Sequence, residues 1–209
     1  MERQRNPRGQ GDRLRTEIVQ AASIMLAASG DAGQITLRGV ARQVGIAATS
    51  VYLHFPDVAH LVAEAMAGFF GELERAVAAA GAGDEAPAAV LRLRCRAFCR
   101  FATDHPGEYR VMFESAQPDL GASADFAESP GRPVFESLAR DIARCGPPAG
   151  ADPFRLAVRL WATLHGLVSL RIHRPRFPWP PLDELVDEAV KAAIGQAVGA
   201  GAGSVGTAK

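Results

Sequence analysis

The chain has 209 residues, of which 48% are hydrophobic and 22% charged, and its formal net charge is zero. This composition is typical of a globular protein with a sizeable core, and the balanced charge gives no sign of a nucleic-acid partner at the level of the whole chain. The arginine-rich N-terminus has no apolar leader, and no apolar run approaches the ~20 residues of a membrane span, so we expect a cytoplasmic protein without a membrane anchor.

Helical spacing of apolar residues continues along most of the chain, and no alternating strand pattern occurs, so we expect an all-α fold. Residues 1–11 are expected to be a flexible basic arm that either contacts phosphates or only keeps the chain in solution. Residues 199–209 are expected to be a disordered glycine-rich tail. The expected helices cover residues 12–29, 37–44, 47–55, 57–80, 86–104, 106–115, 133–145, 153–173 and 182–198, with irregular connections at 115–132 and 173–181.

Two short helices separated by a glycine stand near the N-terminus. Thr36 is expected to cap the helix LRGVARQV, and Gly45 is expected to end it with a tight turn. The next helix starts at about Ala47 and would turn Val51 and Phe55 toward the core. This order is the plan of a helix-turn-helix, whose second helix enters the major groove of DNA, although it also fits a generic pair of short helices.

The second of these helices carries no Lys or Arg, so it cannot form the bidentate contact with guanine. Small side chains at its beginning, from Ala47 to Ser50, would let its backbone approach the base edges. Arg38 on the preceding helix is the remaining candidate for a guanine contact. Part of the specificity is therefore expected to come from DNA shape and from the arm.

Residues 12–62 resemble the DNA-binding domain of TetR-family transcriptional regulators. The resemblance lies in IVQAASIMLAASG and in ITLRGVARQVGIAATSVYLHFPDVAHLV, where T-x-R-x-V-A-x-x-V-G-I leads into S-V-Y-x-H-F-P without gaps. The family's usual lysine after this segment is missing, since Asp57, Val58 and Ala59 stand there; backbone N–H groups at the helix start could replace that phosphate contact. The resemblance and the small residues at the start of the second helix together give the expected DNA contacts: Thr36, Arg38, Ala47, Ala48, Thr49, Ser50, Tyr52 and His54.

The resemblance also implies the domain organisation. A helix-turn-helix domain at 12–56 would be followed by a connecting helix at 57–80 and an effector-binding and dimerisation domain at 81–198. LWATLHGLVSL at 160–170 resembles the W-x-x-x-H-G motif of one C-terminal subclass. The family's homodimer is built from the last two helices of each chain, and the alternative is that these apolar faces pack inside one chain. The implied interface residues are Leu170, Leu185, Val186, Ala189 and Ala193.

The effector pocket is expected among the helices that follow residue 81. Few charged residues interrupt their apolar faces, which favours a small apolar or aromatic effector over a charged one. The same residues can be plain core, and His165 can be a hydrogen-bonded core histidine. The expected effector-binding residues are Phe98, Phe101, Met112, Phe113, Phe135, Trp161 and His165.

Cys95 and Cys99 lie one helical turn apart among the arginines of LRLRCRAFCR. We interpret both as buried free thiols; the alternative is a redox or electrophile sensor, since neighbouring cations can lower the pKa of a thiol. No metal-ligand spacing, phosphate-binding glycine loop or catalytic constellation occurs, so we expect no cofactor and no enzyme. The sequence thus predicts a dimeric DNA-binding repressor released by a ligand, with a thiol-based sensor and a ligand-free architectural DNA binder as alternatives.

Overall fold

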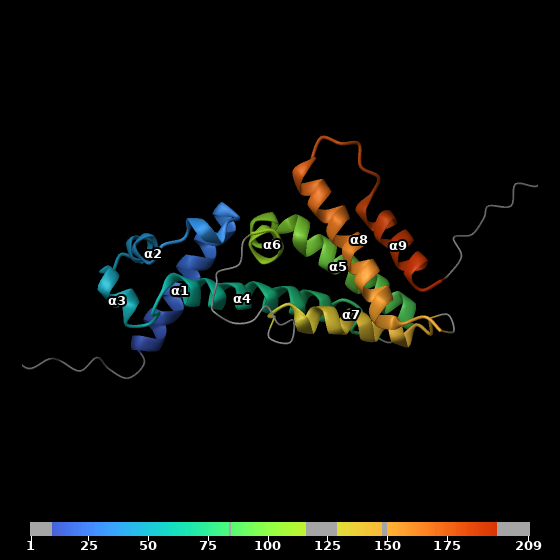
Figure 1. Cartoon of the computed structure of the whole chain (residues 1–209), viewed down its shortest axis with the longest axis horizontal. Helices are drawn as coiled ribbons and strands as arrows, with labels where there is room; N and C mark the ends of the chain where they lie inside the picture. Colours follow the sequence, from blue (N-terminus) through green and yellow to red (C-terminus); the bar gives the residue numbers. More distant parts are fainter. Residues whose placement is uncertain (1–9, 84, 116–128, 148–149, 196–209) are drawn as a thin grey trace, which may run out of the picture. The chain divides into compact units, whose positions relative to one another are not determined.

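The computed structural model describes residues 10–83, 85–115, 129–147 and 150–195 (Figure 1). Every regular element within these ranges is a helix, so the expected all-α fold is confirmed there. Most of the arm at 1–11, residues 116–128 of the long connection and the tail at 199–209 lie outside the described residues. The helices are α1 (Gln10–Ser29), the 3-10 helix η1 (Ala32–Gln34), α2 (Leu37–Val44), α3 (Ala48–Tyr52), α4 (Val58–Ala79), α5 (Pro87–Asp104), α6 (Pro106–Phe113), α7 (Arg132–Arg144), α8 (Pro153–His173) and α9 (Leu182–Ala193).

Three helices end two or more residues earlier than their sequence pattern suggests: α3, α9 and α6, which ends at Phe113 rather than at 115. α3 stops at Tyr52 rather than at residue 55, although the N–H of Phe55 still donates to the carbonyl of Val51 at 2.9 Å. Pro56 follows at once and disfavours helical backbone at the residue before it. α9 stops at Ala193 rather than at 198, because Gly195 adopts the left-handed conformation with φ +70° that ends helices.

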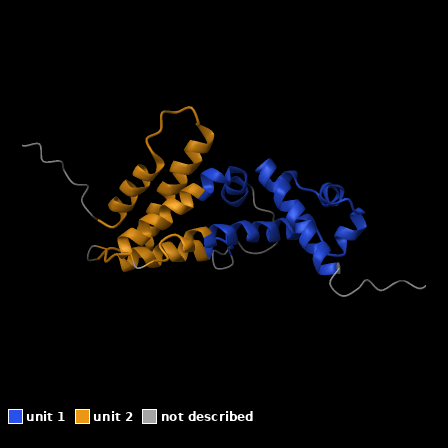
Figure 2. Ribbon diagram, turned by 180° about the vertical axis from the view of Figure 1, so that it is seen from behind, with its two compact units in different colours: residues 1–75, 101–132 blue, residues 76–100, 133–209 orange. Residues whose placement is uncertain are grey.

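The chain divides into two compact units, which Figure 2 shows in different colours. The first unit comprises residues 1–75 and 101–132, and the second comprises 76–100 and 133–209. The first unit holds the two short helices near the N-terminus, and the second holds most of α5 together with α7, α8 and α9. Helices α4 and α5 each contribute residues to both units.

In the first unit α1 is the central helix, packing against α2, α6 and η1. Ile18 and Leu26 of α1 are fully buried, as the helical spacing predicts. Gly107 of α6 lies directly on the backbone of α1, because a Cβ atom there would stand only 1.7 Å from the carbonyl oxygen of Ala27. No larger residue fits at this crossing without separating the two helices.

In the second unit α8 packs against α9, and Leu160, Leu164 and Val168 on α8 are buried. An ion pair with two hydrogen bonds ties α5 to α9: Arg96 donates from Nε and Nη2 to the two carboxylate oxygens of Asp187, at 2.8 and 2.6 Å. Such a paired geometry fixes orientation as well as distance. The charges on the arginine-rich helix α5 thus hold this unit together.

Candidate functional site

The two short helices of the first unit are shaped by local capping. Thr36 Oγ1 accepts the N–H of Gly39 at 3.0 Å at the start of α2, and Gly45 ends that helix with φ +80°. The Gly45 N–H donates to the carbonyl of Ala41 at 2.9 Å. A side chain at Gly45 would be strained at this backbone angle, so the tight turn between α2 and α3 depends on the glycine. Both expectations, the Thr36 cap and the Gly45 turn, are confirmed.

α3 is held in place by one apolar edge and leaves its other face open. Val51 is 0% exposed and Phe55 is 2% exposed, as expected from their spacing. The guanidinium of Arg15 on α1 lies 4.9 Å from the centroid of the Phe55 ring, and Arg15 also pairs with Glu64 on α4. These contacts fix the orientation of α3 relative to α1 and α4.

The residues expected to contact DNA lie together on the segment from Thr36 to His54, all in the first unit. Tyr52 is 55% exposed, and Leu53 beside it, which the sequence reasoning missed, is 84% exposed. The missed signal is the register, since Leu53 follows Thr49 by one helical turn. The expected DNA contacts that are exposed are Thr36, Arg38, Ala47, Thr49 and Tyr52, and those that are half-buried are Ala48, Ser50 and His54.

The beginning of α4 carries a carboxylate where the family resemblance implies a lysine. Asp57 Oδ1 accepts the backbone N–H of His60 at 2.9 Å and lies 2.8 Å from His60 Nδ1. The hydrogen bond from the His60 side chain lowers the pKa of Asp57, with the backbone hydrogen bond adding to it. The His60 N–H is therefore already taken, and the substitute phosphate contact suggested for this helix start is not present at His60.

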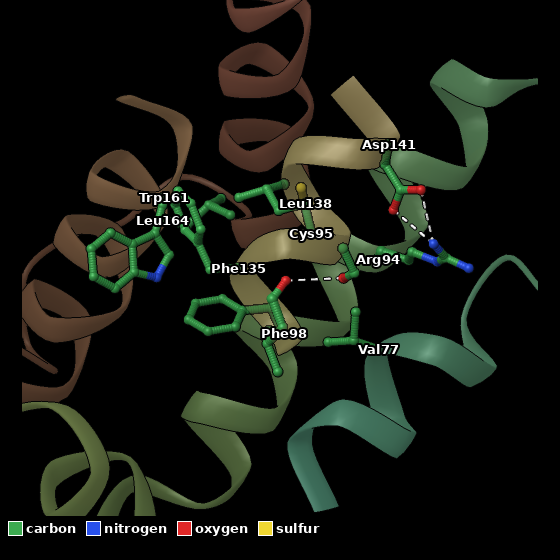
Figure 3. Close-up of a pocket in the computed structure, with 11 residues that line it drawn as sticks. Val77, Arg94, Cys95, Phe98, Phe135, Leu138, Asp141, Trp161 and Leu164 are labelled. Atoms are coloured by element: carbon green, nitrogen blue, oxygen red, sulfur yellow. Dashed lines mark hydrogen bonds and ion pairs between the residues drawn. The ribbon is translucent and has the colours of Figure 1, made fainter. Parts of the chain in front are cut away.

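The second unit contains a pocket that lies between α5, α7 and α8 and takes one residue from the end of α4 (Figure 3). It encloses about 380 Å³, its open mouth included. Seven of its eleven lining side chains are aliphatic or aromatic, so apolar contact dominates. The lining residues are Val77, Arg94, Cys95, Phe98, Val134, Phe135, Ser137, Leu138, Asp141, Trp161 and Leu164.

Aromatic rings form a connected series along this pocket. Phe135 lies 5.7 Å from Trp161, Trp161 lies 4.7 Å from His165, and His165 lies 5.2 Å from Phe98, all between ring centroids. Phe98, Phe135 and Trp161, three of the expected effector residues, line the pocket. His165 does not line the pocket but contacts the rings of Phe98 and Trp161, which do. Edge-to-face ring pairs of this kind stabilise a fixed wall.

Three of the expected effector residues lie elsewhere. Phe101, Met112 and Phe113 belong to the first unit. Phe113 packs against Phe70 and Tyr109, with ring centroids 5.4 and 5.3 Å apart. Their apolar spacing marks them as buried faces, but spacing does not decide which core a face joins.

The polar groups of the pocket are paired with one another. Arg94 Nη1 donates to both carboxylate oxygens of Asp141, at 2.7 and 2.9 Å, and Asp141 is only 3% exposed. Ser137 donates its hydroxyl to the carbonyl of Val134 on its own helix at 2.9 Å. In Figure 3 the ion pair lies on the side of the pocket away from Trp161. Burial lowers the pKa of His165 to about 4, so this imidazole is neutral at neutral pH.

The structure agrees with the favoured interpretation of Cys95 and Cys99 as buried free thiols rather than thiols whose pKa values the arginines of α5 lower. Burial raises the pKa of Cys99 to about 12 and raises that of Cys95 well above its ordinary value. Arg94 and Arg96 do not act on the thiols, because they pair with aspartates on α7 and α9. Both thiols are therefore protonated and shielded, as buried structural cysteines are.

The residues implied for a dimer interface differ in accessibility. Leu170 is 54% exposed at the end of α8, and Leu185, Ala189 and Ala193 on α9 are half-buried. Val186 is 0% exposed and belongs to the core of its own unit. Across the described ranges no helix has the length and hydropathy to cross a membrane, and no three His, Cys, Asp or Glu side chains gather as a metal ion requires.

Comparison with known proteins places these features in a wider group. Residues 91–193 match the family model described as "Tetracyclin repressor-like, C-terminal domain". The fold is similar to that of SCO4313, described as a regulatory protein, with a TM-score of 0.70 and 20% identity over 91% of this chain and 100% of that one. It is also similar to a TetR-like transcriptional regulator from Rhodococcus sp. RHA1, with a TM-score of 0.61 and 17% identity over 90% and 96% of the two chains. AibR, solved in complex with isovaleryl coenzyme A and operator DNA, has a TM-score of 0.61 and 15% identity over 86% and 97%.

Proposed function

Because the chain belongs to the TetR family of transcriptional regulators, which are not enzymes, we propose that it is a homodimeric repressor that releases operator DNA when a small neutral ligand fills its pocket. The observation that carries the proposal is α3, a helix anchored on one edge by Val51 and Phe55 and exposed on the other. A helix presented in this way fits the major groove. This second helix of the pair would read the bases, and α2 would contact the phosphates.

The charges on the two short helices agree with this assignment. Arg38 and Arg42 lie one turn apart on α2 and are both exposed, whereas α3 has no charged residue. Cations beside the groove neutralise phosphates and position the protein, and the uncharged helix can then approach the base edges closely. Tyr52, exposed next to Leu53, is assigned to a phosphate or sugar contact on this face.

The pocket chemistry supports a neutral, apolar or aromatic ligand. Phe98, Phe135 and Trp161 supply flat apolar surface, while the charges of Arg94 and Asp141 compensate each other at hydrogen-bond distance. A carboxylate ligand would have to compete for the Arg94 guanidinium with Asp141, which Arg144 also contacts at 3.5 Å, and would break a buried ion pair, which is costly. A ligand without charge leaves the ion pair of Arg94 and Asp141 intact.

AibR supports the link between ligand and DNA, since that protein is described with both isovaleryl coenzyme A and operator DNA. In this chain the connection would run through α4, which extends without a break from Val58 to Ala79 and places Val77 in the wall of the pocket. A ligand that displaces this end of α4 would change the spacing of two α3 helices in a dimer. Such a ligand weakens DNA binding only by the factor by which it binds the DNA-free conformation more tightly than the DNA-bound one.

A dimer of α8 and α9 is supported by the outer face of α8. Ala162, Gly166 and Leu170 follow one another at one-turn intervals, and a Cβ atom at Gly166 would meet nothing within 4 Å beyond its chain neighbours and the backbone of its own helix. Small residues allow helices of two chains to approach closely, and Leu170, 54% exposed, would be buried between them. Leu185, Ala189 and Ala193 would extend the same interface on α9.

The test is fluorescence anisotropy of the full chain on the DNA upstream of its own gene, in a series of salt concentrations. Tyr52→Ala should weaken binding by at least about tenfold, because both half-sites of a dimer lose one contact. Phe177→Ala is the matched control, since Phe177 is 56% exposed and lies in the second unit, against 55% for Tyr52. Equal effects of the two variants, or binding that ignores salt and sequence, would contradict the proposal.

A further inference from the structure

We propose that Leu53 is a specificity-determining residue that reads the 5-methyl group of a thymine in the major groove of the operator. The inference rests on the proposed DNA-binding function and assigns to that function one base and one side chain. It starts from exposure: at 84%, Leu53 is the most exposed large hydrophobic side chain of the described residues.

The register of α3 places Leu53 at the centre of the open face. Consecutive residues of a helix are rotated by about 100°, so positions two before and two after a buried edge point away from it. Val51 and Phe55 form the buried edge, and Thr49 and Leu53, one turn apart, form the opposite one. Leu53 keeps helical backbone angles, φ −71° and ψ −20°, so the register of α3 extends to it.

The chemistry of this face suits one group on DNA. Among the base edges of the major groove, the thymine methyl is the one apolar group, and an aliphatic side chain is its natural contact. α3 has no cation that would favour guanine, and its outer edge combines the methyl group of Thr49 with the isobutyl group of Leu53. The contact removes both the thymine methyl group and the Leu53 side chain from water, which favours binding.

The surroundings favour DNA over a protein partner at this position. Arg38 and Arg42 on α2 are exposed, and α2 packs against α3, so the helix beside the one that carries Leu53 presents positive charge. Exposed cations on the helix next to an apolar side chain are complementary to phosphates that flank a base edge. A second copy of this chain would present the same positive charge and be repelled.

The experiment uses DNA duplexes recovered from a randomised library by the full-length protein. Each thymine of a recovered duplex is replaced in turn by deoxyuridine, which removes the 5-methyl group and leaves every hydrogen-bonding group unchanged. Affinities are measured by anisotropy for the wild-type chain and for Leu53→Ala. Ile24→Ala is the matched control, because Ile24 on α1 is also a large exposed side chain, at 56%.

For the wild type, removing one methyl group in each half-site should weaken binding by about fourfold per half-site, the change that corresponds to exposing one methyl-sized apolar group. For Leu53→Ala the same replacement should have no effect, and Ile24→Ala should behave as the wild type. The proposal is overturned if no thymine responds, if Leu53→Ala keeps the full loss, or if that substitution changes only self-association. A library that yields no preferred sequence would overturn the proposed function itself, and this inference with it.

Discussion

Gly107 on α6 is the residue at which a single methyl group should do the most damage to the first unit. A Cβ atom there would stand 1.7 Å from the carbonyl oxygen of Ala27 and 2.7 Å from its carbonyl carbon. Real Cβ atoms essentially never come within 3.0 Å of a neighbour, so Gly107→Ala must push α6 and α1 apart by 1.3 Å or more. Neither obstacle is a side chain that can rotate away.

The cost follows from this geometry. Overpacking against rigid neighbours costs about 3 kcal/mol at the upper end of the usual range, and the better helix propensity of alanine returns about 1 kcal/mol. The net loss of about 2 kcal/mol should lower the midpoint of thermal unfolding by roughly 4–8 °C. Since α1 also supports α2, DNA binding should weaken as well.

Gly68→Ala on α4 is the matched control, because a Cβ atom at Gly68 meets nothing within 4 Å. The same substitution should there raise the midpoint by about 2 °C, since it replaces a helix-interior glycine at no steric cost. Circular dichroism melting at one protein concentration compares the three proteins. Midpoints that move in the same direction for both variants, or a Gly107→Ala midpoint equal to that of the wild type, would refute the reasoning.

Three further predictions concern the protonation of His165, the charge of Asp57 and the reactivity of the cysteines. Burial lowers the pKa of His165 to about 4, from its ordinary 6.5, so the unfolded chain binds the proton at a higher pH than the folded chain does. The free energy of unfolding therefore has its full value above about pH 6.5 and decreases as the pH falls, by ~2 kcal/mol at pH 5. His165→Phe should remove most of this slope in urea unfolding curves, and an unchanged slope would assign it to other groups. Asp57→Asn keeps a side-chain acceptor but removes a negative charge near the proposed position of the phosphates. The DNA affinity measured by anisotropy should therefore rise about threefold at low salt and less at high salt. A lower affinity of the variant would contradict the placement of Asp57 near the DNA. In thiol titration with a disulfide reagent, Cys95 and Cys99 should react only after unfolding and Cys145, half-buried, should react first; fast reaction of Cys95 in the folded chain would revive the thiol-sensor alternative.

Local signals were enough for much of the first unit. The Thr36 cap, the Gly45 turn and the buried edge of Val51 and Phe55 depend on residues within one or two helical turns, so their patterns are present in the sequence itself. The family resemblance added the reading of these helices as a DNA-binding pair. The sequence does not predict the exposure of Leu53, because a leucine in an amphipathic pattern is expected to be buried and its exposure depends on the exact register of a short helix.

Non-local pairing explains what the sequence could not show. The sequence shows Arg94 and Arg96 beside the two cysteines, but their partners Asp141 and Asp187 lie 47 and 91 residues away. A carboxylate brought in by another helix offsets the charge of an arginine, while burial is the main cause of the raised thiol pKa values, and no spacing within α5 reveals either effect. Phe113 was likewise assigned to the pocket because apolar periodicity does not tell which core receives a face.

The central claim is that DNA and a neutral ligand are bound by coupled sites on one chain. Its most direct test is the affinity of a neutral bicyclic aromatic such as indole, measured by isothermal titration calorimetry, for the free protein and for its complex with library-selected DNA. Reciprocity requires that the ligand bind the DNA complex more weakly by the same factor by which it weakens DNA binding. We expect matching factors of at least about fivefold. Equal ligand affinities with and without DNA would contradict the claim, because a ligand that does not distinguish the two states cannot release the operator.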